Sequence, residues 1–254
     1  MGILNVTPDS FSDGGLFLDC GAAIEAGRRM MEEGADLIDV GGESTRPGAA
    51  DVLAHDEIAR VIPVVAALAG MGIPVSIDTM KPEVARAALA EGAQMVNDVN
   101  GLRGDGMLEL VSESDCGVCI MHMQGSPRTM QKSPSYGNVV SEVLEFLVGQ
   151  TALVGGLPGR VWIDPGIGFG KTVDHNLTLL RNLRDFVAIG IPVLVGVSRK
   201  SFIGRVTGVE DPTDRREGTL AAQVWAQSQG VRILRAHDVR ASRRAIDMMA
   251  AIQG

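Results

Sequence analysis

The chain has 254 residues, of which 45% are hydrophobic and 21% charged, a composition typical of globular proteins with a sizeable core. Its formal net charge of −8 disfavours a nucleic-acid or anionic-membrane surface, and no apolar run approaches the roughly 20 residues of a membrane span. The three cysteines, Cys20, Cys116 and Cys119, are too few for a disulfide framework, and nothing marks a signal peptide. We therefore expect a cytoplasmic protein.

Short apolar stretches typical of buried β-strands recur along the whole chain. They span residues 2–4, 37–40, 74–77, 94–97, 118–121, 161–164, 192–196 and 232–235. Between them lie stretches with helical spacing, such as 22–33, 57–68, 82–91, 139–154 and 219–229. Continuous apolar strands that alternate with helices indicate a parallel sheet buried on both faces. The pattern predicts an α/β protein, a (β/α)8 TIM barrel that forms a single domain over residues 1–254.

The main competing fold is a doubly wound open sheet, which normally carries a glycine-rich dinucleotide loop after its first strand. Here that position holds NVTPDS. The later stretch PGIGFGKT resembles a phosphate-binding P-loop, but Pro165 replaces the first glycine and has no N–H to donate. The pair Cys116 and Cys119 leads into a strand rather than a helix, so we interpret Cys119 as a core residue.

Polar side chains follow every predicted strand at its carboxyl end, which is the end that carries ligand chemistry in this fold. They include Asn5 and the segment 9–13 after the first strand, and Thr45 and Arg46 after the second. The remaining positions are Asp78, Asn97, Asp98, the stretch MHMQG, Asp164, and the stretches SRKS and RAH. Their recurrence at one end of all the strands predicts a functional rim.

The residue types narrow the expected ligand. Asp78, Asn97 and Asp164 supply acceptors and an amide that suit the N–H donors of an aminopyrimidine edge. Lys200 would add a donor, although its residue type also fits a solvated surface charge. The cations that follow the last strand, together with Arg46, lie where this fold usually binds phosphate. The residues of the rim therefore suit a ligand that has a flat ring beside an anionic group. We interpret His122, between two methionines, as a hydrogen-bonded histidine of the core or of the surroundings of the site.

Eight blocks of sequence, spread over essentially the whole chain, closely resemble the dihydropteroate synthases of the pterin-binding TIM-barrel superfamily. The blocks are MGILNVTPDSFSDGG, DVGGESTRPGA, SIDTMKPEVARAAL, VNDVNGLR, MHMQGSPRTMQ, DPGIGFGKT, VGVSRKSFIG and RAHDV. The resemblance implies a transferase that joins 6-hydroxymethyl-7,8-dihydropterin diphosphate to p-aminobenzoate. The products would be 7,8-dihydropteroate and diphosphate, on the route to folate.

The resemblance also implies roles for individual residues. Those expected around the pterin ring are Asp78, Asn97, Met121, Asp164, Phe169 and Lys200. Those expected around the diphosphate are Thr45, Arg46, Arg235 and His237. The expected p-aminobenzoate pocket comprises Phe11, Pro47 and Ser201, and the expected Mg2+ ligands are Asn5 and, after loop closure, Asp13. The residues expected to act in the chemistry are Asp78, Lys200, Arg235 and His237.

Three further expectations come with the resemblance. The protein would form a homodimer, and it would be sensitive to sulfonamides because no insertion lies beside Phe11. Relatives usually carry residues before the first strand, often a small hairpin, whereas here Met1 opens that strand directly. The alternatives are a methyltetrahydrofolate:corrinoid methyltransferase, which shares the barrel, and a pterin-binding paralogue without catalysis.

Overall fold

Eight short parallel strands lie at the centre of the molecule, in a computed structural model that describes residues 1–7, 15–45, 51–155 and 159–254. They are β1 (Gly2–Asn5), β2 (Ile38–Gly41), β3 (Val75–Asp78), β4 (Met95–Asp98), β5 (Gly117–Met121), β6 (Val161–Asp164), β7 (Leu194–Gly196) and β8 (Ile233–Arg235). Each lies within two residues of the corresponding stretch predicted from the sequence.

The strands close into a ring. Strands β1 to β6 pair in sequence order, and β7 pairs with β8. Two parallel bridges, Ile163 with Val193 and Gly2 with Ala236, join these two sheets at both edges. The amide of Ile3 donates to the carbonyl of Ala236 at 3.0 Å, which ties the first strand to the last. The prediction of a (β/α)8 barrel is therefore confirmed.

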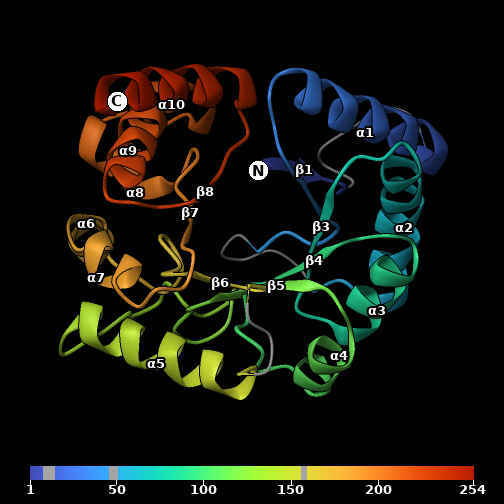
Figure 1. The fold of residues 1–254 in the computed structure, drawn as a ribbon, viewed down its shortest axis with the longest axis horizontal. Helices are drawn as coiled ribbons and strands as arrows, with labels where there is room; N and C mark the ends of the chain where they lie inside the picture. Colours follow the sequence, from blue (N-terminus) through green and yellow to red (C-terminus); the bar gives the residue numbers. More distant parts are fainter. Residues whose placement is uncertain (8–14, 46–50, 156–158) are drawn as a thin grey trace.

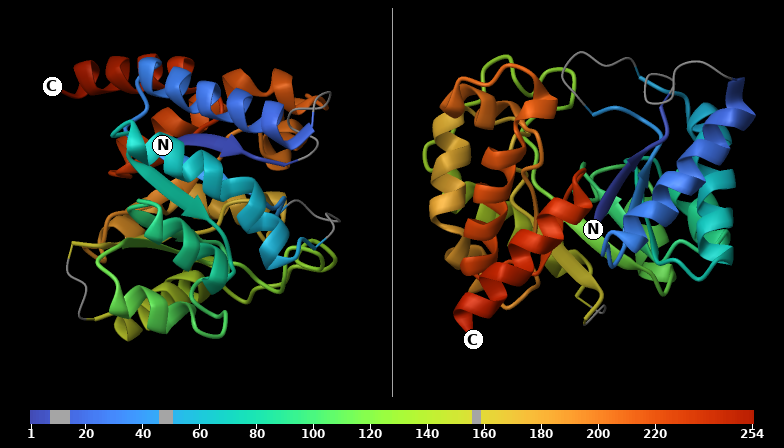
Figure 2. Two further views of the ribbon diagram at one scale, coloured as in Figure 1. Left: turned by 90° about the vertical axis from the view of Figure 1, so that its right-hand side faces the viewer. Right: turned by 90° about the horizontal axis from the view of Figure 1, so that it is seen from above.

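Helices surround the strands, as Figures 1 and 2 show. They are α1 (Gly15–Glu32), α2 (Ala54–Gly70), α3 (Pro82–Ala90), α4 (Met107–Glu113), α5 (Val139–Leu153), α6 (Val173–Arg181), α7 (Leu183–Val187), α8 (Ser201–Thr207), α9 (Arg216–Ser228) and α10 (Val239–Gln253), with a short 3-10 turn η2 (Pro212–Asp214). Helix α3 illustrates the local rules, because Pro82 occupies its first turn and its buried residues Val84, Ala85 and Ala88 share one face. Among the described residues, no helix is long and apolar enough to cross a membrane.

Two of the apolar clusters formed by the described residues hold the strands and helices of the barrel together. The larger lies between the strands and the helices, as expected when a parallel sheet is covered on both faces. The smaller contains Met95, Cys119 and Leu194, with Trp162 and Ile233 packed against them. These five residues come from strands β4 to β8, so they fill the barrel interior. Cys116 and Cys119 are both free and buried, in agreement with the structural interpretation of the pair.

Candidate active site

The carboxyl ends of neighbouring strands place three of the polar positions, Asn5, Asp78 and Asn97, in one row. Asn5 is paired with Gly41, Gly41 with Asp78, and Asp78 with Asn97. Farther around the ring, Met121 is paired with Asp164. Residues that are distant in the sequence thus meet at one mouth of the barrel, because parallel strands all end on the same side.

Arg235, the last residue of β8, links two carboxylates across this mouth. Its Nε donates to Oδ2 of Asp39 and its Nη2 to Oδ2 of Asp78, both at 2.6 Å. Burial opposes the charge of Arg235, but Asp39 and Asp78 raise its pKa above the ordinary value. The guanidinium is therefore permanently charged and held in one orientation.

Asp39 is a central residue that the sequence analysis missed. Its side chain is 0% exposed, and its Oδ2 accepts from Asn97 Nδ2 at 2.9 Å as well as from Arg235. The bond from Nδ2 leaves the amide oxygen of Asn97 to face other partners. Asp39 could have been identified from the sequence, because it is a carboxylate in the middle of an apolar strand. Such a group is costly to bury unless hydrogen-bond donors surround it.

Asp78 occupies an environment that resists its negative charge. Burial raises its pKa to about 7, with a further contribution from Asp39, while Arg235 acts in the opposite direction. The carboxyl therefore titrates near neutral pH, as residues at functional sites often do.

A second group lies across the mouth, around the loop that follows β6. Asp164 accepts from the amide of Gly166 at 2.7 Å, and burial raises its pKa while Lys200 lowers it. Lys200 donates to the carbonyl of Ile167, and its Nζ lies 4.5 Å from the centre of the Phe169 ring. Burial lowers the pKa of Lys200 to about 8, although Asp164 opposes this shift. Met121 belongs to the same apolar cluster as Phe169.

The loops after β7 and β8 are tied to each other. The Nδ1 of His237 lies 2.9 Å from the hydroxyl of Ser198, and the His237 amide donates to that hydroxyl at 3.2 Å. Arg199 makes a two-pronged ion pair with Asp238, at 3.0 and 2.7 Å. Lys200 and His237 are therefore carried by two turns with a shared set of hydrogen bonds. Ser201 is exposed at the first position of α8, directly after Lys200.

Some of the predicted positions lie outside the described residues, and one described position has another role. Phe11, Asp13, Arg46 and Pro47 lie outside the described residues. Asp98 is near the rim in sequence, but its carboxylate accepts from two backbone amides of its own turn, those of Asn100 and Leu102, at 2.8 and 2.7 Å. Its role in the described structure is to shape that turn.

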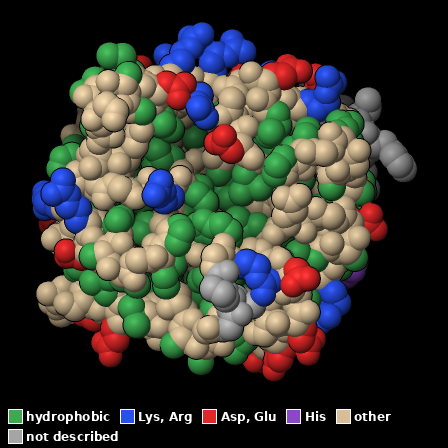
Figure 3. Space-filling view, in the orientation of Figure 1, with side chains coloured by type: hydrophobic (Ala, Val, Ile, Leu, Met, Phe, Trp, Pro, Cys, Tyr) green, Lys and Arg blue, Asp and Glu red, His purple; other side chains and the backbone are tan. Residues whose placement is uncertain are grey.

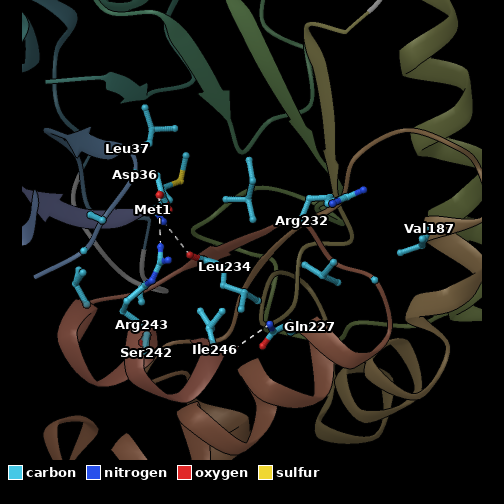
Figure 4. A pocket seen from close by; sticks show the side chains of 17 residues that line it. Met1, Asp36, Leu37, Val187, Gln227, Arg232, Leu234, Ser242, Arg243 and Ile246 are labelled. Carbon is cyan, nitrogen blue, oxygen red and sulfur yellow. Dashed lines mark hydrogen bonds and ion pairs between the residues drawn. The ribbon is translucent and has the colours of Figure 1, made fainter. Parts of the chain in front are cut away.

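Two pockets mark opposite ends of the barrel. The one of about 400 Å3 lies among the loops that follow strands β2 to β5 and is lined by Thr45, Asp51, Met80 and Arg128 among others, but not by Asp78, Asn97, Asp164 or Arg235. The one of about 800 Å3 lies where the strands begin, between Met1, Leu37 and Ile246 (Figure 4). Figure 3 shows hydrophobic side chains gathered at the centre of one face, with charged groups around them. The polar residues at the strand ends belong to the mouth and not to the larger pocket.

A buried ion pair network supports the base of the loop after β2. The Nζ of Lys81 donates to Glu43 at 2.6 Å and to Glu57 at 2.5 Å, and Glu57 is 0% exposed. The other oxygen of Glu43 accepts from the amide of Val52 at 2.9 Å. Glu43 thereby joins the two ends of the segment that carries Thr45. None of these three charged residues was singled out from the sequence, because their spacing shows no local pattern.

Replacing Lys81 by Met is expected to lower the free energy of unfolding by about 3–5 kcal/mol, because it takes the ion-pair partner away from the buried carboxylate of Glu57 and from the partly buried Glu43. Urea denaturation at pH 7 measures the change. The matched control is Lys132→Met on an exposed side chain, for which we expect a change within about 0.5 kcal/mol. A Lys81→Met variant as stable as this control would show that the network contributes nothing.

The fold and the residues at its mouth agree with the comparisons. A family model described as "Pterin binding enzyme" matches residues 1–237. The dihydropteroate synthase of Escherichia coli (strain K12) is 46% identical over 255 residues, which cover 99% of this chain and 90% of that protein. The chain belongs to the pterin-binding enzymes and, among them, to the dihydropteroate synthases.

Solved structures give the same result. The dihydropteroate synthase of Xanthomonas albilineans with 4-aminobenzoic acid superimposes with a TM-score of 0.93 at 47% identity, covering 100% of this chain and 92% of that one. The structure of the enzyme from the same organism in complex with 7,8-dihydropteroate has a TM-score of 0.88 at 41% identity, with 100% and 92% covered.

Proposed function

We propose that this chain condenses 6-hydroxymethyl-7,8-dihydropterin diphosphate with p-aminobenzoate to give 7,8-dihydropteroate and diphosphate in folate biosynthesis. The observation that carries the proposal is that acceptors suited to a pterin edge and the ion-paired cation Arg235 lie at the same mouth of the barrel. The relatives solved with 4-aminobenzoic acid and with 7,8-dihydropteroate support the same substrates.

The pterin ring would lie between the two groups of residues at the mouth. Asp164 and Asn97 accept and donate along its aminopyrimidine edge, and Lys200 donates to its ring acceptors. Met121 and Phe169, which share one apolar cluster, pack against the ring faces. The lowered pKa of Lys200 fits a donor that is shielded from water.

The diphosphate would bind Arg235 and His237 together with Thr45 and Arg46, the last of which lies outside the described residues. Charged donors aimed at an anion are the strongest hydrogen bonds available to such a site. Asn5 ends β1 in the same row as Asp78, and its side-chain amide makes no hydrogen bond with the described part of the chain. One amide oxygen suits Mg2+, which commonly takes one or two protein ligands together with waters and substrate phosphates.

We propose Asn5, joined by Asp13, as the Mg2+ ligands. The bound ion would supply positive charge that makes diphosphate a better leaving group. Among the described residues, no group of three or more His, Cys, Asp or Glu side chains could hold a metal ion. Waters and substrate oxygens would complete the coordination of the ion, as is typical of Mg2+.

The reaction breaks a C–O bond before it forms a C–N bond. Arg235 and His237 stabilise the charge that develops on the departing diphosphate. The methylene carbon of the pterin becomes a cation, and the carboxylate of Asp78 lies at the mouth to stabilise it. The amine of p-aminobenzoate then attacks this carbon and loses a proton. Phe11 and Pro47 would flank the aniline ring, and Ser201 would receive its carboxylate at the start of α8.

The test is diphosphate release by the purified protein with both substrates and Mg2+. Omitting p-aminobenzoate, or adding a chelator, should abolish the signal. Pterin binding without diphosphate release would identify a non-catalytic paralogue. Methyl transfer from methyltetrahydrofolate to a corrinoid would identify the alternative enzyme, which has no need of the cationic set formed by Arg235 and His237.

Activity should depend on the ionisation of Asp78. With a pKa of about 7, the carboxyl becomes protonated as the pH falls, and a neutral carboxyl stabilises a cation poorly. We expect kcat/KM for the pterin diphosphate to fall with decreasing pH below an apparent pKa near 7, approaching about tenfold per pH unit. In the Asp78→Asn variant this fall of kcat/KM at low pH should disappear, and only the pH dependence caused by titration of the substrate phosphates should remain. If kcat/KM falls equally at low pH in the wild type and in the variant, the titration of Asp78 is not the cause of the fall.

We also propose that the protein acts as a single-domain homodimer in the cytoplasm and that sulfonamides inhibit it by competing with p-aminobenzoate. A related enzyme from Yersinia pestis has been solved as a sulfonamide drug complex.

A further inference from the structure

The loop after β6, residues 166–170, is held through its backbone carbonyls. Ile167 accepts from Lys200, Gly168 from Gln131, Phe169 from Lys171 and Gly170 from Tyr136. Gly166, Gly168 and Gly170 all have positive φ angles, which turn successive peptide groups in different directions. This loop belongs to the stretch PGIGFGKT, in which Pro165 replaces the first glycine of the phosphate-binding motif. Its three glycines therefore need a reason other than phosphate binding.

Lys171 lies at the centre of this arrangement and is 3% exposed. Its Nζ donates to the carbonyl of Phe169 at 2.9 Å and to the carbonyl of His122 at 3.3 Å. It also lies 3.0 Å from Nδ1 of His122. Burial lowers the pKa of His122 to about 3, so this ring is neutral and its Nδ1 can accept from the ammonium group. Three acceptors thus surround one buried amine, although burial lowers the pKa of Lys171 to about 7 while Asp164 opposes this shift.

The two carbonyls bound by Lys171 come from two chain segments, the end of β5 and the loop after β6, that both contribute to the apolar cluster of Met121, Met123 and Phe169. Phe169 is itself a member of that cluster, and His122 lies between the members Met121 and Met123. A close contact reinforces the connection, because a Cβ placed on Gly166 would lie 1.9 Å from the carbonyl oxygen of His122. The separation between the end of β5 and the Phe169 loop is therefore fixed by Lys171 and by the absence of a side chain at residue 166.

We propose that Lys171, assisted by Tyr136, is a positioning residue that fixes Phe169 relative to Met121 and thereby sets the affinity for the pterin ring. The role rests on the proposed function, since these two side chains are the ones expected to pack on the pterin. Lys171 does not take part in the chemistry, because its donors are already directed at three protein acceptors. Tyr136 anchors the far end of the same loop, where its hydroxyl donates to Gly170 at 2.8 Å.

The test is Lys171→Met, which keeps the length of the side chain and removes all its donors. We expect the KM for the pterin diphosphate to rise at least about tenfold, with kcat within about threefold. The KM for p-aminobenzoate, measured at saturating pterin substrate, should stay within about twofold. Calorimetric titration with 6-hydroxymethylpterin should show the same loss of affinity without requiring catalysis.

Lys132→Met, on an exposed side chain of the neighbouring β5–α5 segment, is the matched control and should behave as wild type. A purely structural role for Lys171 would lower the melting temperature while leaving the affinity of the folded fraction for 6-hydroxymethylpterin unchanged, and that result would overturn the proposal.

If Lys171→Met does not fold, Tyr136→Phe decides the question, since it removes one hydroxyl from a half-buried ring. A rise in the dissociation constant of about threefold supports the proposal, and an unchanged constant contradicts it. The titration also separates this proposal from the proposed function. Wild-type protein that binds 6-hydroxymethylpterin but releases no diphosphate would refute the synthase activity alone, whereas wild-type protein without pterin binding would refute both.

Discussion

Replacement of Asp78 by Asn is expected to lower kcat by about 10²–10³-fold, which is the usual cost of losing one preorganised electrostatic group. The affinity for the pterin substrate should change by only a few fold. Asn has nearly the same shape as Asp and can still accept a hydrogen bond from Arg235, but it carries no negative charge to stabilise the methylene cation. Steady-state kinetics together with a titration of 6-hydroxymethylpterin separates the two effects.

Asp164→Asn provides the contrast to this variant. We propose that Asp164, which accepts from the amide of Gly166, binds the pterin edge, so its replacement should act mainly on pterin affinity. If Asp78→Asn instead reduces turnover and pterin affinity to the same extent, the carboxylate contributes to binding alone and its role in stabilising the cation is wrong.

Replacement of Arg235 by Met is expected to have the second large effect, on both stability and activity. It removes the guanidinium from two carboxylates, and Asp39 is 0% exposed. The loss of one partner from a buried ion pair costs about 3–5 kcal/mol of unfolding free energy. The loss of the cation that we propose stabilises the departing diphosphate should lower kcat/KM by about 10²–10³-fold.

The double variant Asp39→Asn/Arg235→Met distinguishes these two contributions. Removing the unpaired charge at Asp39 should restore part of the stability that Arg235→Met loses, because the two residues interact directly. Activity should remain at the level of the single Arg235→Met variant. Urea denaturation and diphosphate release measure the two quantities separately. Additive losses of stability would show that the 2.6 Å ion pair between Arg235 and Asp39 is energetically unimportant.

Local sequence patterns were sufficient for the elements and for the end of the barrel that carries the site. Strands such as β3 and β6 are short apolar runs, and helices such as α3 begin at a proline, so each can be identified within a few neighbouring residues. The parallel direction of the strands then places Asp78, Asn97 and Asp164 at one mouth. The helix starts were less accurate. Helix α1 begins at Gly15, seven residues before the stretch at 22–33 that the spacing predicted.

Long-range contacts decided the rest. Arg235 and Asp39 are separated by 196 positions, and no local periodicity connects them. The same holds for Lys171 with His122 and for Lys81 with Glu43, whose partners come from other loops of the barrel. The sequence by itself determined the strands, most of the helices and the polar residues at the strand ends, because short-range apolar spacing and residue type encode them. Only the tertiary structure decided which charges are buried together, because closure of the ring brings their strands side by side.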